Sequence, residues 1–178
     1  MLVHHRDETL EIVLNRPHVR NAVNTAMRDG LLEALAVAAA DCSISDVQIR
    51  GEGKAFCSGG DLDEFGTFDD PSSAHLVRLT TSVGRAIDSI AERVTVHLHG
   101  ACAGSGIELP AFARTVTADA AATLALPEVS LGLIPGAGGT VSLTSRAGRH
   151  RVALLALCGR AIDATTAREW GIVDAVAP

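Results

Sequence analysis

Short apolar runs with the composition of β-strands alternate along this chain with longer stretches whose apolar residues have helical spacing. Strands that alternate with helices join through crossover connections into a largely parallel sheet, so the pattern predicts an α/β fold. The 178 residues show no internal repeat, low-complexity tract or linker, and we expect one domain that spans residues 1–178. The predicted strands are 9–15, 47–51, 94–100 and 114–120, and the predicted helices are 24–41, 71–92 and one beginning within 106–113.

Two of the predicted strands lead into glycine-rich loops, "GKAFCSGGD" (53–61) and "GACAGSG" (100–106). Backbone N–H groups at such a junction can bind an anion or stabilise a developing oxyanion. Neither loop matches the GxGxxG pattern of dinucleotide-binding folds or the GxSxG pattern of serine hydrolases, and no P-loop is present. Taken alone, such a loop is better explained by close packing of backbone segments, for which glycine is well suited.

Two glutamates lie in otherwise apolar sequence, Glu108 after the second glycine loop and Glu128 in "LPEVSLGLIPGAGG". A carboxylate among apolar neighbours is unfavourable unless it is paired, hydrogen-bonded or protonated. Two such acids facing one cavity can work as general acid and general base. The residues alone leave the alternative open that each caps a helix or pairs with an arginine. The run "IPGAGG" (134–139) is expected to form a turn that shapes the wall of the pocket below Glu128.

Charge and hydropathy exclude several classes of protein. The formal net charge of −6 argues against a nucleic-acid partner, which needs a basic face. No apolar run reaches the roughly 18 residues that a membrane helix requires. The N-terminal segment has no apolar core of the kind found in secretory signals, so we expect a soluble, cytoplasmic protein.

The cysteines and histidines of the chain are candidate metal ligands or nucleophiles. The four cysteines form no CxxC pair and indicate reduced, mostly buried thiols. Cys57 and Cys102, in the two glycine loops, are expected to be small buried fillers. His97 and His99 alternate on one predicted strand, but no carboxylate or cysteine completes a metal-binding set, so we expect no metal ion.

Five stretches resemble the crotonase superfamily, and specifically enoyl-CoA hydratase. They occur in the family's order and together cover nearly the whole chain. The resemblance implies a crotonase-like fold, a spiral of ββα units, that lacks the family's usual C-terminal helices because the chain ends at Pro178. The stretches are "LNRPHVRNAVNTAM", "GEGKAFCSGGDLDEF", "GACAGSGIEL", "LPEVSLGLIPGAGGT" and "GRAIDATTAREWGIVDAV".

The resemblance assigns a role to each candidate catalytic residue. The backbone N–H groups of Gly60 and Ser105 would polarise the thioester carbonyl of an acyl-CoA; the family usually has glycine at the position of Ser105. Glu108 would help activate the water that attacks C3, and Glu128 would deliver a proton to C2. This implies an enoyl-CoA hydratase that needs no cofactor, because CoA arrives as part of the substrate.

The resemblance also implies contacts with the CoA portion of the substrate. The segment from Ser58 to Asp63 would line the adenosine and pantetheine, and Arg16 would meet a phosphate, unless Arg16 is a solvated loop residue. The substrate-binding residues expected on this basis are Arg16, Ser58, Gly60, Asp61, Leu62, Asp63 and Ser105.

Two other functions stay open at this point. An enoyl-CoA isomerase commonly needs only one acid, so two filled acid positions favour hydration. A non-catalytic partner of a full-length homologue is the alternative from a different class. This chain departs from the family at Pro110, which follows the first acid closely, and at His99, where the family usually has asparagine. By resemblance we expect a homotrimer or a dimer of trimers.

Overall fold

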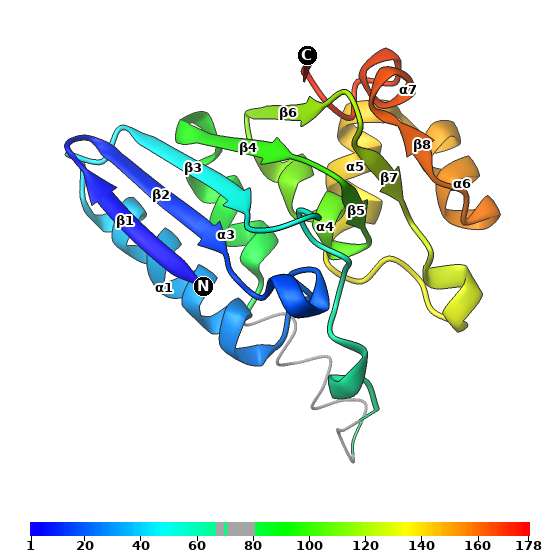
Figure 1. Ribbon diagram of the computed structural model, residues 1–178, viewed down its shortest axis with the longest axis horizontal. Coiled ribbons are helices and arrows are strands. Elements are labelled where there is room, and N and C mark those ends of the chain that lie inside the picture. Colours follow the sequence, from blue (N-terminus) through cyan, green and yellow to red (C-terminus); the bar gives the residue numbers. More distant parts are fainter. Residues whose placement is uncertain (67–69, 71–80) are drawn as a thin grey trace.

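A six-stranded sheet forms the frame of the molecule (Figure 1). The computed structural model describes residues 1–66, 70 and 81–178. The strand order is β1-β2-β3-β4-β6-β9, in which β1 pairs antiparallel with β2 and the other pairs are parallel. The strands are β1 (Leu2–Arg6), β2 (Thr9–Leu14), β3 (Asp46–Gly51), β4 (Val94–Leu98), β6 (Thr115–Asp119) and β9 (Ala175–Ala177).

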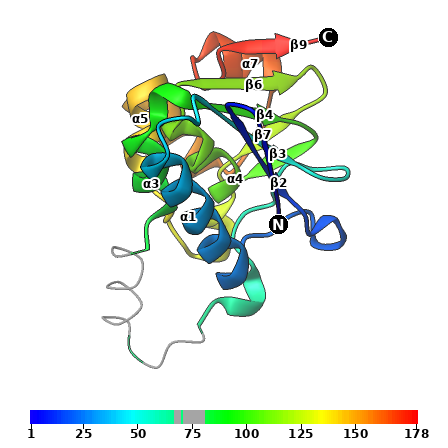
Figure 2. The same cartoon turned by 90° about the vertical axis from the view of Figure 1, so that its left-hand side faces the viewer.

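One face of this sheet is buried under two helices, α1 (Thr25–Ala40) and α3 (Val83–Ser89), as Figure 2 shows. Side chains alternate along each strand, so Ile12, Ile49 and Val96 point into the same core. The predicted helix 24–41 is confirmed as α1, and the side chain of Asn24 caps it by accepting a hydrogen bond of 3.0 Å from the amide of Met27. Of the predicted helix 71–92, residues 71–80 lie outside the described residues.

A second, three-stranded sheet carries the other half of the fold. Its order is β5-β7-β8, with β5 (Ala101–Ala103) parallel to β7 (Thr123–Ala125) and β8 (Ile162–Asp163) antiparallel to β7. The remaining α-helices of the described residues are α4 (Ser105–Glu108), α5 (Gly139–Ala147), α6 (Arg149–Cys158) and α7 (Ala164–Glu169). The short 3-10 helices are η1 (Pro17–Val19), η2 (Leu62–Glu64), η3 (Ala91–Arg93), η4 (Pro110–Phe112) and η5 (Glu128–Leu131).

The helix predicted to begin within residues 106–113 is interrupted after one turn. Helix α4 ends at Glu108, and η4 begins at Pro110. Proline has no N–H group to donate within a helix interior, but it fits a first helical turn. Glu108 therefore lies at the end of a single turn, directly after the second glycine loop.

The two glycine loops lie side by side, because short backbone pairings join them. The amide of Ala103 donates to the carbonyl of Cys57 at 2.9 Å, and Cys57 and Cys102 form a parallel bridge. At Gly106 an added Cβ would lie 2.3 Å from the Cys57 carbonyl oxygen, so the backbones approach more closely than any side chain permits. The glycines of the second loop are therefore needed for this contact between the loops.

Candidate active site

In the first glycine loop, the backbone amide of Gly60 is unengaged by any described residue. The amide of Ser58 donates to Arg20 O at 2.9 Å, and the amide of Asp61 donates to Val23 O at 2.9 Å. Between them, the amide of Gly60 has no acceptor among the described residues. The loop thus fixes its backbone on both sides of Gly60 and leaves this N–H group available.

The second glycine loop holds another such amide at the start of α4. The amide of Ala103 donates to Cys57 O at 2.9 Å, and the amide of Gly104 donates to Ala125 O at 3.0 Å. Within the part of the chain that the structure describes, the amide of Ser105 donates to no acceptor. The first amides of a helix have no partner inside the helix, which accounts for this freedom.

Glu108 is a buried acid that two backbone amides hold. The residue is only 2% exposed, and its Oε2 accepts hydrogen bonds from the amides of Gly139 at 2.8 Å and Ala137 at 2.9 Å. Burial raises the pKa of Glu108 to about 7, and the negative charge of Glu128 adds to this rise, while the amide hydrogen bonds oppose it. A carboxyl with such a pKa can exchange protons near neutral pH.

Glu128 lies at the start of η5 and faces the same loop. Burial raises the pKa of this carboxyl as well. Its Oε2 is buried and has no hydrogen-bond partner among the described residues. A Cβ added at Gly104 would lie 2.7 Å from Glu128 Oε1, so this carboxylate lies against the residue that precedes Ser105. The structure therefore brings together Glu108, Glu128 and the second glycine loop. The residues alone had left this arrangement open, and the family resemblance implied it.

The side chain of Ser105 is turned away from solvent. Its hydroxyl lies near the Cys57 thiol but makes no hydrogen bond of ordinary geometry to any described residue. Beside it lies a small apolar cavity of about 20 Å³. Ser105, Gly106, Pro110 and side chains of the sheet, α1 and α3 form the lining, among them Leu31, Val83, Ile87, Val96 and Leu109.

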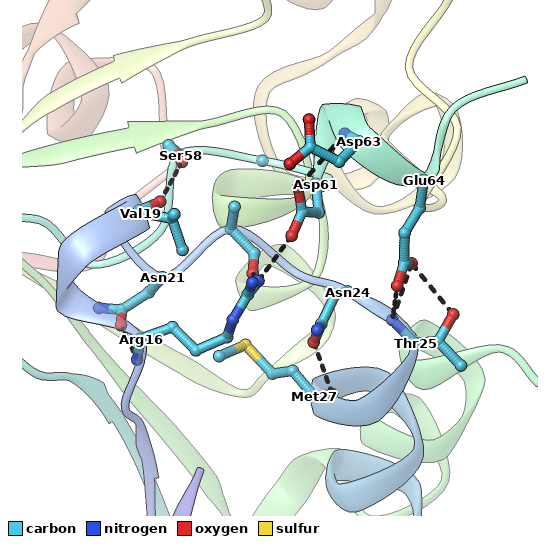
Figure 3. A network of polar contacts seen from close by, with 12 residues as sticks. Arg16, Val19, Asn21, Asn24, Thr25, Met27, Ser58, Asp61, Asp63 and Glu64 are labelled. Atoms are coloured by element: carbon cyan, nitrogen blue, oxygen red, sulfur yellow. Dashed lines mark hydrogen bonds and ion pairs between the residues drawn. The ribbon is translucent and has the colours of Figure 1, made fainter.

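Arg16 belongs to a polar network rather than to open solvent (Figure 3). Its Nη1 lies 2.8 Å from Asp61 Oδ2 and 2.7 Å from the carbonyl oxygen of Ala22. The interpretation of Arg16 as a solvated loop residue is therefore wrong. Its predicted contact with a CoA phosphate is untested by this geometry and stays a prediction.

The other side chains predicted to line CoA differ in how they are held. The Ser58 hydroxyl donates to Val19 O at 3.3 Å, and Asp61 also accepts from the amide of Asp63 at 3.3 Å. Leu62, at the start of η2, is 58% exposed. The contacts of these residues with CoA stay predictions.

Asn21 is completely buried and is a functional residue that the sequence patterns did not predict. Its Nδ2 donates to Glu52 O and Ala55 O, both at 2.9 Å, and its Oδ1 accepts from the amide of Arg16 at 2.7 Å. Its backbone has a φ of 56°, a left-handed conformation that asparagine adopts more readily than most residues. The signal available in the sequence was an asparagine in the turn "RPHVRN".

The cysteines of the two loops have the character that the sequence predicted. Burial raises the pKa of Cys57 to about 11 and that of Cys102 to about 12, so both stay protonated and pack as small apolar groups. The expectation of mostly buried thiols is wrong for the other two, because Cys42 and Cys158 are exposed.

The two histidines considered as a metal pair contact different partners. The ring of His97 bridges Thr117 Oγ1 and Asp119 Oδ1, each at 2.9 Å, whereas His99 Nε2 contacts Gly53 O at 3.1 Å. Within residues 1–66, 70 and 81–178, no group of three or more histidine, cysteine or acidic residues is arranged to hold a metal ion. In the same part of the chain, no helix has the length and apolar character needed to cross a membrane.

Comparison with known proteins gives a consistent picture. The family model described as enoyl-CoA hydratase/isomerase matches residues 5–178. The 2,3-dehydroadipyl-CoA hydratase of Escherichia coli is 33% identical over 178 residues, which is 100% of this chain and 69% of that protein. The mevalonyl-coenzyme A hydratase of Beauveria bassiana is 32% identical and is matched over 95% of this chain and 63% of its own length.

Solved structures of the same group share the fold. The enoyl-CoA hydratase of Bacillus anthracis superposes with a TM-score of 0.90 at 30% identity, over 99% of this chain and 69% of that one. The enoyl-CoA hydratase of Thermoplasma volcanium gives a TM-score of 0.90 at 33% identity, over 99% and 71%. The predicted crotonase-like α/β fold is confirmed, and the C-terminal part of these homologues has no counterpart in the chain.

Proposed function

The chain belongs to the enoyl-CoA hydratase/isomerase family, and we propose that it is an enoyl-CoA hydratase, which adds water reversibly to a 2-trans-enoyl-CoA. The observation that carries this proposal is a buried acid, Glu108, and a half-buried acid, Glu128, beside two unengaged amides. Glu108 and Glu128 both have raised pKa values, and Glu128 Oε2 has no partner among the described residues. A buried carboxylate oxygen without a hydrogen bond is unfavourable, so it suits a site that a water or substrate completes.

The amides of Gly60 and Ser105 would act on the thioester. Each would donate a hydrogen bond to the thioester oxygen, which gains negative charge as the double bond is attacked. Donors that are already in place at such an oxygen stabilise the enolate-like intermediate without further reorganisation. The Ser105 side chain does not hinder this role, because the amide, and not the hydroxyl, makes the contact.

The two carboxyl groups would move the protons. As the water oxygen adds to C3, the Glu108 carboxylate accepts a proton from that water, and the Glu128 carboxyl donates a proton to C2. Proton exchange with the solvent then returns both groups to their starting states, so the net reaction consumes one water and no other reagent. Two acids with raised pKa values are suited to these opposite roles near neutral pH.

We propose a short, unsubstituted acyl chain for the substrate, such as the crotonyl group. The side chains beside Ser105 support an unsubstituted chain, because those that line the small cavity there are otherwise apolar. The cavity itself has room for about one water molecule, so a crotonyl group would have to displace some of these side chains. The names of the two relatives described above refer to acyl groups with additional oxygen atoms, 2,3-dehydroadipyl and mevalonyl. An apolar lining offers no partner for such groups, and a buried polar group without a partner is disfavoured.

The direct test is incubation of the protein with crotonyl-CoA. The proposal predicts loss of the absorbance of the conjugated thioester and a product heavier by one water. Some relatives are named as isomerases, for example the 1,2-epoxyphenylacetyl-CoA isomerase of Escherichia coli at 31% identity. A 3-enoyl-CoA should therefore be tested in parallel. Double-bond migration without hydration of crotonyl-CoA would contradict the hydratase proposal.

We also propose that the chain forms a homotrimer or a dimer of trimers. The support is an exposed apolar surface on η5, the loop after it, α5 and α6. Burial of such a surface between copies is favourable, because it removes apolar area from water. Light scattering that finds a folded monomer would contradict this proposal. The exposed apolar side chains of this surface are those of Val129, Leu131, Leu133, Ile134, Val141, Leu154 and Leu157.

A further inference from the structure

The backbone on either side of Gly60 is held by one neighbouring residue, Val23. The amide of Val23 donates to Gly59 O at 2.8 Å, and the amide of Asp61 donates to Val23 O at 2.9 Å. Gly60 itself pairs with Val23 as an isolated parallel bridge. The direction in which the Gly60 N–H group points is therefore set by how the first loop sits against residues 21–24.

Arg16 ties these two segments together through a single nitrogen atom. Its Nη1 donates both to Asp61 Oδ2 at 2.8 Å and to Ala22 O at 2.7 Å (Figure 3). Asp61 follows Gly60 and Ala22 precedes Val23, so the guanidinium fixes the residue next to each partner of the bridge. The backbone of Arg16 is itself fixed, since its amide donates to Asn21 Oδ1 at 2.7 Å.

The Arg16–Asp61 ion pair is better shielded from water than the Arg50–Glu11 ion pair, which joins two neighbouring strands. The side chains of Arg16 and Asp61 are 24% and 14% exposed, whereas those of Arg50 and Glu11 are 42% and 29% exposed. Shielding from water strengthens a charge-assisted hydrogen bond. The Arg16 hydrogen bond also holds the pKa of Asp61 below its usual range, so this carboxylate is ionised at neutral pH.

We propose that Arg16 is a positioning residue, which aims the backbone amide of Gly60 at the substrate through its ion pair with Asp61. This inference rests on the proposed function, because only there does the Gly60 amide act as an oxyanion donor. It replaces the expected contact between Arg16 and a CoA phosphate with a role inside the loop. A donor displaced by a fraction of an ångström loses much of its effect on the transition state.

The test compares Arg16→Met and Asp61→Asn with the wild-type protein. For crotonyl-CoA hydration we expect kcat to fall about tenfold to a hundredfold while KM changes less than about threefold. With bound butanoyl-CoA, which cannot be hydrated, the infrared band of the thioester carbonyl should move back toward the frequency of the free thioester. Arg16→Lys, which keeps the charge but has only one nitrogen at the end of a flexible chain, should recover part of kcat.

The matched control is Arg50→Met, which removes one half of the Glu11–Arg50 ion pair between two strands. It should leave kcat, KM and the carbonyl band unchanged. The inference would be overturned if Arg16→Met raised KM without lowering kcat, and if variant and wild type had the same KM for a substrate built on 3′-dephospho-CoA. Arg16 would then be a phosphate ligand.

A measurement on the free protein separates this inference from the proposed function. Nuclear magnetic resonance relaxation of the Gly60 amide should show greater motion in Arg16→Met and Asp61→Asn than in wild type, with the Ser105 amide unchanged as internal reference. A Gly60 amide that stays equally rigid in both variants would refute the positioning role. A wild-type protein that binds no acyl-CoA would instead refute the proposed function, and the relaxation result would still decide the role of Arg16.

Discussion

Glu108 Oε2 accepts a hydrogen bond of 2.8 Å from the backbone amide of Gly139, at the start of α5. The segment that reaches from Glu128 to Gly139 thus supplies one acid of the site and also the amides that hold the other. A Cβ at Gly139 would lie 2.6 Å from Glu108 Cγ, so the backbone can approach this carboxyl only with glycine in that position. The two acids are consequently placed by one continuous stretch of chain.

Replacing Glu108 by glutamine should stabilise the protein relative to wild type, and this gain in the free energy of unfolding should be larger at higher pH. The pKa of Glu108 is raised from 4.5 to about 7, so the folded state favours the protonated form. The contribution of Glu108 to the free energy of unfolding therefore falls progressively as the pH rises from about 4.5 to about 7, by about 3 kcal/mol at the limit. Glutamine stays neutral and escapes this loss.

Urea denaturation of wild type and Glu108→Gln at pH 5 and pH 8 checks this prediction. The free energy of unfolding of the variant relative to wild type should be larger at pH 8 than at pH 5. A difference that is the same at both pH values would mean that Glu108 ionises in the folded protein as easily as in the unfolded chain.

Replacing Glu128 by glutamine should lower the pKa of Glu108. The negative charge of Glu128 is one cause of the raised pKa of Glu108, and glutamine removes that charge with little change in shape. Infrared difference titration of the carboxyl band, with Glu108→Gln to identify the signal, measures the shift. An unchanged or higher pKa would show that the two acids do not interact.

Replacing Gly104 by alanine should impair catalysis more than folding. The new Cβ would lie 2.7 Å from Glu128 Oε1, and the backbone there has a φ of 53° and a ψ of −121°. Glu128 must move, and we expect kcat to fall by about tenfold or more because its proton transfer is misaligned. Crotonyl-CoA kinetics provide the measurement.

Gly148→Ala is the matched control for this substitution. Gly148 also has a positive φ, 81°, but an added Cβ would meet nothing within 4 Å. Both variants should lose stability through backbone strain, of the order of 1–3 kcal/mol. If Gly148→Ala lowered kcat as much as Gly104→Ala, the effect would come from strain and not from contact with Glu128.

Replacing Arg146 by methionine should destabilise the fold without involving the site. The Arg146 guanidinium donates to the carbonyl groups of Ala111, Ala113 and Arg114 and pairs with Asp174, and its side chain is only 13% exposed. Loss of several charge-assisted hydrogen bonds should lower the free energy of unfolding by about 2–4 kcal/mol.

Thermal unfolding of Arg146→Met beside Arg114→Met tests that prediction. The Arg114 side chain pairs with Glu92 at the surface, where the two side chains are 62% and 78% exposed, so its loss should change stability by less than about 1 kcal/mol. Equal effects of the two substitutions would show that the buried network around Arg146 is unimportant.

The larger elements of the fold could be predicted from the sequence because their periodicity is local. Strand β2, strand β3 and helix α1 each contain enough residues for apolar side chains to repeat on one face. Strands of two or three residues, such as β5 and β7, are too short to show a repeat. Their pairing is set by tertiary contacts that no local pattern records.

The candidate site shows the same limit. Residues alone left Glu108 and Glu128 undecided between catalysis and a structural role, and only the resemblance paired them. The run "IPGAGG" was predicted as a turn, but its role as donor to Glu108 depends on a hydrogen bond across 31 residues. The contact between Arg16 and Asp61 spans 45 residues and was equally invisible to sequence reasoning.

The measurement that tests the account most directly is kcat for hydration of crotonyl-CoA by wild type, Glu108→Gln and Glu128→Gln, with binding of butanoyl-CoA measured for each. The account predicts turnover by wild type, and a loss of at least about a hundredfold in each variant with binding retained. Either variant turning over crotonyl-CoA at close to the wild-type rate would contradict the assignment of Glu108 and Glu128 as the groups that move the protons.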